Sequence, residues 1–167
     1  PDAISALIEV LEDQTQEPMV RHEAAEALGA IGSSDTLDIL RKHRSDPVIE
    51  VAETCELALE RIKWLQSPES AKIDIRSPYN SVDPAPPSQN NDVHKLKTIL
   101  MDDGSSLFER YRAMFSLRNI RSPEAVVALG AALRCGSALF RHEIAFVLGQ
   151  LQDEGGVPFL KESLEDC

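Results

Sequence analysis

The sequence predicts an all-α fold, an α-solenoid of stacked antiparallel helix pairs arranged in two halves. Apolar residues recur at helical spacing in one segment after another. A shift of about thirty residues superimposes the apolar positions of neighbouring segments, bringing Val20 onto Val51 and Phe115 onto Phe146. A helix pair of that length cannot bury its apolar face alone, so successive pairs must stack. The composition agrees, because 43% of the residues are apolar and only 5% aromatic, which favours small aliphatic packing.

The helix limits follow from this periodicity and from residues that begin and end helices. Pro18 and Pro47 suit a helix start, where the missing N–H is harmless, and Gly32 suits a helix end. In the first half we expect helices over residues 3–11, 18–31, 37–43 and 48–65. In the second half we expect helices over residues 92–101, 106–120, 123–133, 138–151 and 157–164.

The helical pattern stops between the two halves. Residues 66–91 are rich in serine and asparagine and contain Pro68, Pro78, Pro84, Pro86 and Pro87. Such a composition predicts a linker or a long surface loop. We therefore divide the chain into first-half repeats at residues 1–65, a linker at 66–91 and second-half repeats at 92–167.

The charge and the cysteines limit the class of partner and the compartment. A formal net charge of −11 at pH 7 argues against nucleic acid or an anionic membrane as the main partner and favours a basic partner or a cationic ligand. No apolar run approaches the roughly 20 residues that span a bilayer. Cys55, Cys135 and Cys167 are widely spaced and form no C-x-x-C motif, which predicts a reducing, cytoplasmic setting.

The tripeptide Arg-His-Glu occurs at residues 21–23 and again at 141–143, in the same helical frame. On a helix the apolar side chains of each copy form one stripe, and the histidine is predicted to point away from it. The members of the two stripes are Val20, Ala24, Ala27, Leu28 and Ile31 in the first copy, and Phe140, Ile144, Val147, Leu148 and Leu151 in the second. An alanine and a glycine, Ala25 with Gly29 and Ala145 with Gly149, flank the two histidines. Because glycine inside a helix costs roughly 1 kcal/mol relative to alanine, we expect another group to approach closely beside each histidine.

Paired imidazole and carboxylate donors without a thiolate suit non-haem iron, manganese or zinc. Adjacent side chains diverge on a helix, so a metal would need further ligands from neighbouring repeats. One histidine beside a glutamate is usually only a solvated surface pair, but repetition in the same frame favours a functional site. The corresponding positions of the other repeats, Glu53-Thr54 and Tyr111-Arg112, show that the fold does not require the pair.

The remaining polar residues of this kind have simpler interpretations. His43 is interpreted as a helix-end residue and His94 as a surface residue after the linker. Glu26 is expected to line an acidic inner face of the solenoid.

Four stretches carry a resemblance to a known family. These are PMVRHEAAEALGAIG at 18–32, SVDPAPP at 81–87, FERYRAMF at 108–115 and GSALFRHE at 136–143. They resemble the deoxyhypusine hydroxylase family of HEAT-repeat monooxygenases. The resemblance covers essentially the whole chain, in the loop as well as in the helices.

The resemblance implies a di-iron enzyme with two Fe²⁺ ions that uses dioxygen to hydroxylate deoxyhypusine on the precursor of eukaryotic initiation factor five A. It places His22, Glu23 and His142 at iron-ligand positions. Glu143 falls at a position that binds substrate, where a carboxylate would hold the ammonium group of the long amine side chain.

The chain departs from the family in one respect. The family carries four His-Glu motifs and this sequence contains two, so we expect an internal fragment that lacks the first and the last motif. On this reading one copy cannot complete the ligand set, iron binding is weak or absent, and the fragment is inactive. Uncapped solenoid ends would also favour self-association.

Two other functions are compatible with the residues alone. A non-catalytic HEAT-repeat scaffold could bind a basic protein partner on its inner face. A single-metal hydrolase is the weaker alternative, because no serine or cysteine nucleophile stands out and the two pairs lie in opposite halves.

Overall fold

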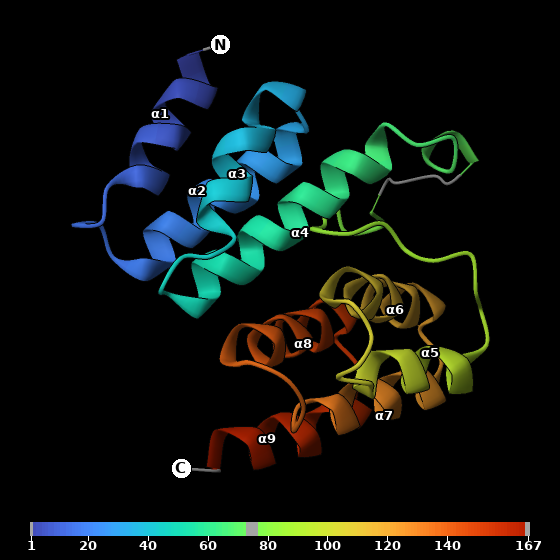
Figure 1. Cartoon of the computed structure of the whole chain (residues 1–167). Coiled ribbons are helices and arrows are strands. Elements are labelled where there is room, and N and C mark those ends of the chain that lie inside the picture. The colour runs from blue at the N-terminus through green and yellow to red at the C-terminus, as the bar shows by residue number, and fades with distance from the viewer. Residues whose placement is uncertain (1, 73–76, 166–167) are drawn as a thin grey trace. The chain divides into compact units, whose positions relative to one another are not determined.

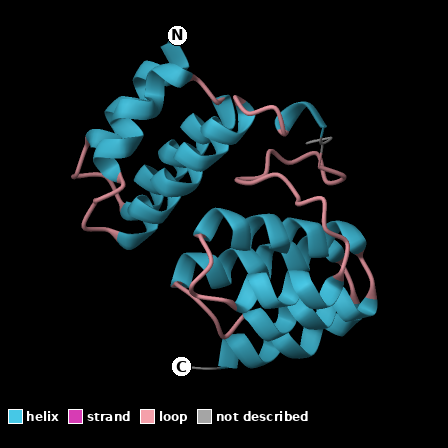
Figure 2. Ribbon diagram, turned by 45° about the vertical axis from the view of Figure 1, so that its right-hand side comes forward, coloured by secondary structure: helices cyan, strands magenta, loops and turns pink. Residues whose placement is uncertain are grey.

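The computed structural model describes residues 2–72 and 77–165. Over these residues the chain forms nine α-helices and three short 3-10 helices, and no strand (Figure 2). This confirms the predicted all-α class. None of the helices in the described ranges is long and apolar enough to cross a bilayer. Cys167 lies outside the described residues.

The chain divides into two compact units, Pro1–Arg76 with Val82–Ala85, and Ser77–Ser81 with Pro86–Cys167. The α-helices of unit 1 are α1 (Asp2–Glu12), α2 (Pro18–Ile31), α3 (Leu37–His43) and α4 (Ile49–Leu65) (Figure 1). Those of unit 2 are α5 (Val93–Met101), α6 (Leu107–Ile120), α7 (Pro123–Ala132), α8 (Ala138–Leu151) and α9 (Val157–Glu165). The 3-10 helices are η1 (Ser34–Thr36), η2 (Ser70–Lys72) and η3 (Glu154–Gly156).

The expected helix limits agree with these bounds to within one or two residues. Pro18 is the first residue of α2, and Gly32, with a φ of 74°, ends that helix in the left-handed conformation. Asp92 and Ser106, which the sequence places at helix starts, act as N-caps of α5 and α6.

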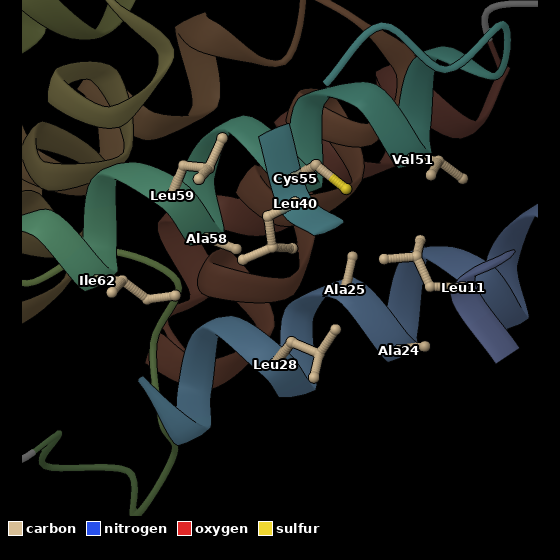
Figure 3. Close-up of a cluster of buried hydrophobic side chains, with 10 residues drawn as sticks. All are labelled: Leu11, Ala24, Ala25, Leu28, Leu40, Val51, Cys55, Ala58, Leu59 and Ile62. Carbon is tan, nitrogen blue, oxygen red and sulfur yellow. The ribbon is translucent and has the colours of Figure 1, made fainter. Parts of the chain in front are cut away.

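The core of unit 1 forms where α2 packs between α1 and α4. Short connections make successive helices antiparallel, as expected for stacked helix pairs. Figure 3 shows the buried cluster, in which small side chains of α2 meet aliphatic side chains of its neighbours. Its members are Leu11, Ala24, Ala25, Leu28, Leu40, Val51, Cys55, Ala58, Leu59 and Ile62.

The orientation predicted for His22 is wrong. The side of α2 that carries His22, Ala25 and Gly29 packs against α4, and His22 is only 6% exposed. Conversely, Val20 and Ile31, which were assigned to the buried stripe, are 44% and 49% exposed. A single buried stripe does not describe α2, because the helix is covered on two sides, by α1 and by α4.

The close approach expected beside each histidine occurs at only one of them. A Cβ added to Gly29 would lie 2.8 Å from the Cβ of Ala58 and 2.9 Å from its Cα, so the backbones of α2 and α4 nearly touch. In the described part of the chain, nothing lies within 4 Å of a Cβ added to Gly149. The helix corresponding to α4 would follow α9, after the last described residue, so the close approach expected at Gly149 stays a prediction.

A buried ion pair and a backbone contact connect α2 to the loop between α3 and α4 and to the end of α1. The Nε of Arg21 donates to the carbonyl of Leu11 at 2.9 Å, and its two terminal nitrogens donate to the carboxylate of Asp46 at 3.2 and 2.5 Å. Burial alone would raise the pKa of Asp46, but hydrogen bonds from Arg21 and from the N–H of Val48 outweigh it and lower the pKa to about 2. His43, the last residue of α3, also contacts Asp46, with Nδ1 at 3.1 Å.

Unit 2 has an arginine contact of the same kind and a more aromatic core. The Nε of Arg110 donates to the carbonyl of Leu100 at 3.0 Å. Arg118 is fully buried, with its guanidinium 4.8 Å from the ring centroid of Phe115 and 5.0 Å from that of Tyr79. Cation–π contacts of this kind compensate for the burial of the charge.

The described part of the proline-rich segment packs on the helices instead of extending freely. The Nε of Arg61 donates to the carbonyl of Asp83 at 3.1 Å within unit 1. The N–H of Ser88 donates to the hydroxyl of Ser116 at 2.8 Å within unit 2. Ala85 is completely buried. The segment is thus an ordered surface loop in this region, one of the two alternatives predicted from its composition.

Large apolar side chains lie exposed on the last two helices of unit 2, namely Phe146 on α8 and Val157 and Leu164 on α9. Self-association through such side chains stays a prediction.

The Asp46 ion pair should make unit 1 sensitive to acid. Replacing Asp46→Asn leaves a buried guanidinium without its charge partner, which should lower the free energy of unfolding by about 3–5 kcal/mol at neutral pH. Because the folded pKa is about 2 and the ordinary value is 3.8, this stabilisation is present above pH 3.8 and is lost as the pH falls through 2. Urea denaturation of the wild type and the variant at pH 7 and pH 2.5 measures both effects.

The matched control is Asp38→Asn, whose carboxylate pairs with Arg41 but is almost fully exposed. It should change the free energy of unfolding by less than about 1 kcal/mol at either pH. Equal losses for the two variants would contradict the buried-pair argument.

The two glycines beside the histidines should respond oppositely to alanine. Gly29→Ala forces a methyl group into the backbone of α4 and should destabilise the chain by about 1–3 kcal/mol. Gly149→Ala meets open space and should stabilise it by about 0.5–1 kcal/mol, because alanine favours the helix. Thermal or urea unfolding followed by circular dichroism distinguishes the signs, and destabilisation by both variants would refute the assigned packing.

Candidate metal centre

The candidate site in unit 1 is organised by the second turn of α2. His22 lies there, and its ring packs against α4, where its Nδ1 is 2.6 Å from the hydroxyl oxygen of Thr54. Thr54 is itself only 3% exposed. The contact depends on the close approach of the two helices at Gly29 and Ala58. The imidazole is therefore held in place from its Nδ1 side.

The other ring nitrogen of His22 faces two carboxylates of the same helix. Its Nε2 lies 3.9 Å from an oxygen of Glu23 and 3.8 Å from an oxygen of Glu26. Glu23 is largely exposed, whereas Glu26 is about one-third exposed. One imidazole nitrogen and carboxylate oxygens thus converge near one edge of the helix, and this donor chemistry suits a divalent transition metal.

The ligand number is smaller than a complete site requires. Over the described ranges, no group of three or more histidine, cysteine, aspartate or glutamate side chains is arranged so that it could hold a metal ion. The residues of α2 therefore fit iron in the kind of donor they offer, and they supply only part of a coordination sphere.

Glu26 is more closely associated with His22 than the sequence analysis indicated. Burial raises the pKa of Glu26, and the negative charges of Glu23 and Asp83 raise it further. The carboxylate of Glu26 is thus repelled by two others, and it lies beside the imidazole of His22. A bound cation would relieve this repulsion, because positive charge favours the ionised form of each carboxylate.

In unit 2, the second His-Glu pair lies on α8 in a different environment. Ser137 caps the helix by accepting a hydrogen bond from the N–H of Phe140 at 3.1 Å. His142 is exposed and Glu143 is half-buried. The predicted apolar stripe of this helix is buried, so the predicted orientation of His142 is confirmed. The stripe consists of Phe140, Ile144, Val147, Leu148 and Leu151.

In the repeats without the His-Glu pair, residues at the corresponding positions pack in the core or hydrogen-bond to a neighbouring side chain. Tyr111 of α6 packs against Phe140 and Phe115, with ring centroids 5.6 and 6.2 Å apart. Thr54 of α4 contacts His22. The role of Thr54 does not follow from the sequence pattern used above, although one signal is present. Thr54 lies thirty-one residues after Glu23, at the corresponding position of the next repeat.

The remaining histidines and the described cysteines do not add to this site. His94 is exposed, as predicted, near the start of α5. Cys55 is completely buried, and burial raises the pKa of its thiol to about 12. Cys55 and Cys135 are both free thiols. The donors at the candidate site are thus nitrogen and oxygen.

Comparison with protein-family models agrees with the repeated helix pairs. A model described as HEAT repeats matches residues 1–60. A model described as PBS lyase HEAT-like repeat matches residues 109–135 and 140–166. Both matches fall on stacked helix pairs, one in each unit.

Individual proteins match nearly the whole chain, with high sequence identity. Deoxyhypusine hydroxylase of Drosophila melanogaster is 59% identical over 98% of this chain and 54% of its own length. The Homo sapiens protein of that name is 57% identical over 99% of this chain and 54% of its own. The chain spans about half the length of the curated relatives it matches.

A solved structure shows that the similarity extends to the three-dimensional fold. The structure of human deoxyhypusine hydroxylase in complex with glycerol matches with a TM-score of 0.92 and 57% sequence identity. The match covers 99% of this chain and 57% of that chain. The repeated helix pairs, the repeated His-Glu pair and these matches together show a HEAT-repeat chain that is similar, over nearly its whole length, to about half of deoxyhypusine hydroxylase.

Proposed function

We propose that this chain is part of a deoxyhypusine hydroxylase, an iron- and dioxygen-dependent monooxygenase that completes hypusine synthesis, and that the activity belongs to the full-length enzyme. Its substrate is then the deoxyhypusine side chain on the precursor of eukaryotic initiation factor five A. The observation that carries the proposal is the His-Glu pair, present once in each unit at the same helical frame. It occurs within a chain 57–59% identical to proteins that carry this enzyme name.

The proposal assigns iron binding to His22, Glu23 and His142, as the resemblance implies. Two Fe²⁺ ions per enzyme would supply the electrons that activate dioxygen for insertion of one oxygen atom. The part of the site on α2 supports this assignment, because His22 Nε2 lies beside the carboxylates of Glu23 and Glu26. A buried imidazole held on its other nitrogen is a prearranged ligand, which reduces the entropy lost on metal binding.

The same proposal gives Glu143 the task of binding the substrate. Its half-buried carboxylate on α8 would accept charge-assisted hydrogen bonds from the ammonium group of deoxyhypusine. The net charge of −11 would assist by attracting a cationic side chain and its basic surroundings. We also assign the protein to the cytoplasm, in agreement with its free thiols.

A second candidate function is a non-catalytic scaffold that binds a basic partner. The acidic net charge favours it as well, because charge attraction alone needs no metal. It gives no reason for a His-Glu pair to recur in both units.

Histidine substitutions in the full-length protein distinguish the two functions. His142→Ala should abolish hydroxylation while changing the free energy of unfolding by less than about 0.5 kcal/mol, because the side chain is exposed. His22→Ala should abolish hydroxylation too, but it removes the buried hydrogen bond between His22 and Thr54 and should destabilise by about 1–3 kcal/mol. The measurement is the gain of one oxygen atom by the deoxyhypusine-containing substrate, followed by mass spectrometry.

His94→Ala is the control, because His94 is an exposed histidine away from both His-Glu pairs. It should hydroxylate at the wild-type rate. Wild-type hydroxylation by His142→Ala would remove that residue from the iron site. Retained binding of the substrate protein, with no hydroxylation by the wild type, would favour the scaffold.

A further inference from the structure

The hydroxyl group of Thr54 connects His22 to the backbone of α4. Its oxygen lies 2.6 Å from Nδ1 of His22 and 2.8 Å from the carbonyl oxygen of Glu50, one turn earlier in the same helix. A carbonyl oxygen can only accept, so the single hydroxyl proton of Thr54 is donated to Glu50. The hydroxyl oxygen must then accept a hydrogen bond from Nδ1–H of His22.

This arrangement determines which nitrogen of His22 carries the proton. A neutral imidazole has one N–H, and a hydrogen bond from Nδ1–H leaves the lone pair on Nε2. Nε2 is the nitrogen that lies beside the carboxylates of Glu23 and Glu26. The two ring nitrogens therefore have different roles. Nδ1–H hydrogen-bonds to Thr54, and the lone pair of Nε2 is the one that can bind a metal ion.

Burial makes the arrangement rigid. His22 is 6% exposed and Thr54 is 3% exposed, so bulk water has little access to either side chain. Both residues belong to unit 1, on two helices whose backbones nearly touch at Gly29 and Ala58. Rotation of the ring would break a buried hydrogen bond, which is costly when no solvent replaces it.

We propose that Thr54 is a positioning residue, which holds His22 in the Nδ1–H form so that Nε2 is presented to the metal. The repeat that lacks the His-Glu pair thus orients the imidazole of the repeat that carries it. The assignment of iron to Nε2 rests on the proposed function, whereas the orienting hydrogen bond does not. Groups of this kind fix the tautomer and direction of metal-ligating histidines, and their loss typically lowers metal affinity about 10–100-fold.

The first experiment measures the tautomer of His22 in the metal-free chain. Nitrogen-15 NMR at pH 8, where an ordinary imidazole is neutral, distinguishes a protonated Nδ1 from a protonated Nε2. The wild type should show the Nδ1–H form. Thr54→Val, which keeps the shape and removes the hydroxyl, should shift His22 to a mixture or to the Nε2–H form.

Two further variants control for packing and folding. Thr54→Ser keeps the hydroxyl and should retain the Nδ1–H form. Thr36→Val makes the same chemical change at another buried threonine of unit 1, whose hydroxyl donates to the carbonyl of Ser33, and it should leave His22 unchanged. Far-ultraviolet circular dichroism checks that each variant is folded. An Nδ1–H form of His22 that persists in a folded Thr54→Val variant overturns the proposal.

The second experiment tests the metal part by anaerobic titration of the full-length protein with Fe²⁺ alone. Paramagnetic broadening of the His22 ring signals reports weak as well as tight binding at this residue. Thr54→Val should require about 10–100-fold more Fe²⁺ than the wild type for the same broadening, and Thr54→Ser should resemble the wild type. Equal Fe²⁺ requirements for Thr54→Val and the wild type overturn the positioning role.

The two experiments separate this inference from the proposed function. A tautomer shift in Thr54→Val, together with no broadening of His22 in the wild type at any Fe²⁺ concentration, supports the orienting hydrogen bond. The same result overturns the assignment of iron to His22.

Discussion

The close packing of α2 on α4 is the constraint on which unit 1 depends. Gly29 has no side chain, and Ala58 has a small one, so the two helices approach until their backbones nearly touch. A wider separation would leave the ring of His22 out of reach of Thr54 and open the cluster of small aliphatic side chains around Ala25. The glycine thus serves the site indirectly, because it sets the distance at which the imidazole meets its supporting hydroxyl.

The two Arg-His-Glu copies differ in what covers them among the described residues. His22 packs against α4, whereas His142 is exposed on α8. The helix that would correspond to α4 in the following repeat would come after α9, beyond the last described residue. The neighbouring repeat therefore decides how rigidly His22 is held.

The fold could be predicted in detail from the sequence, because helix periodicity and end signals such as Pro18 and Gly32 are local. The orientation of His22 could not, since one helical wheel assumes one buried stripe and α2 is covered on two sides. Thr54 was missed for a related reason. Its role depends on a contact thirty-two residues away in sequence, and nothing in its own helix indicates it. The residues of the candidate site came from motif repetition, and their ligand roles stay a prediction.

The arginine contacts at the first helix pair of each unit have a consequence for how such a chain can diversify. Arg21 reaches the carbonyl of Leu11, and Arg110 reaches that of Leu100, each near the negative end of the preceding helix. Each of the helix pairs α1–α2 and α5–α6 is thereby stabilised by a hydrogen bond from its own guanidinium group. The residue that follows is His22 in one case and Tyr111 in the other. An evolving lineage can exchange that residue, gaining or losing a reactive group, without loosening the hairpin on which it stands.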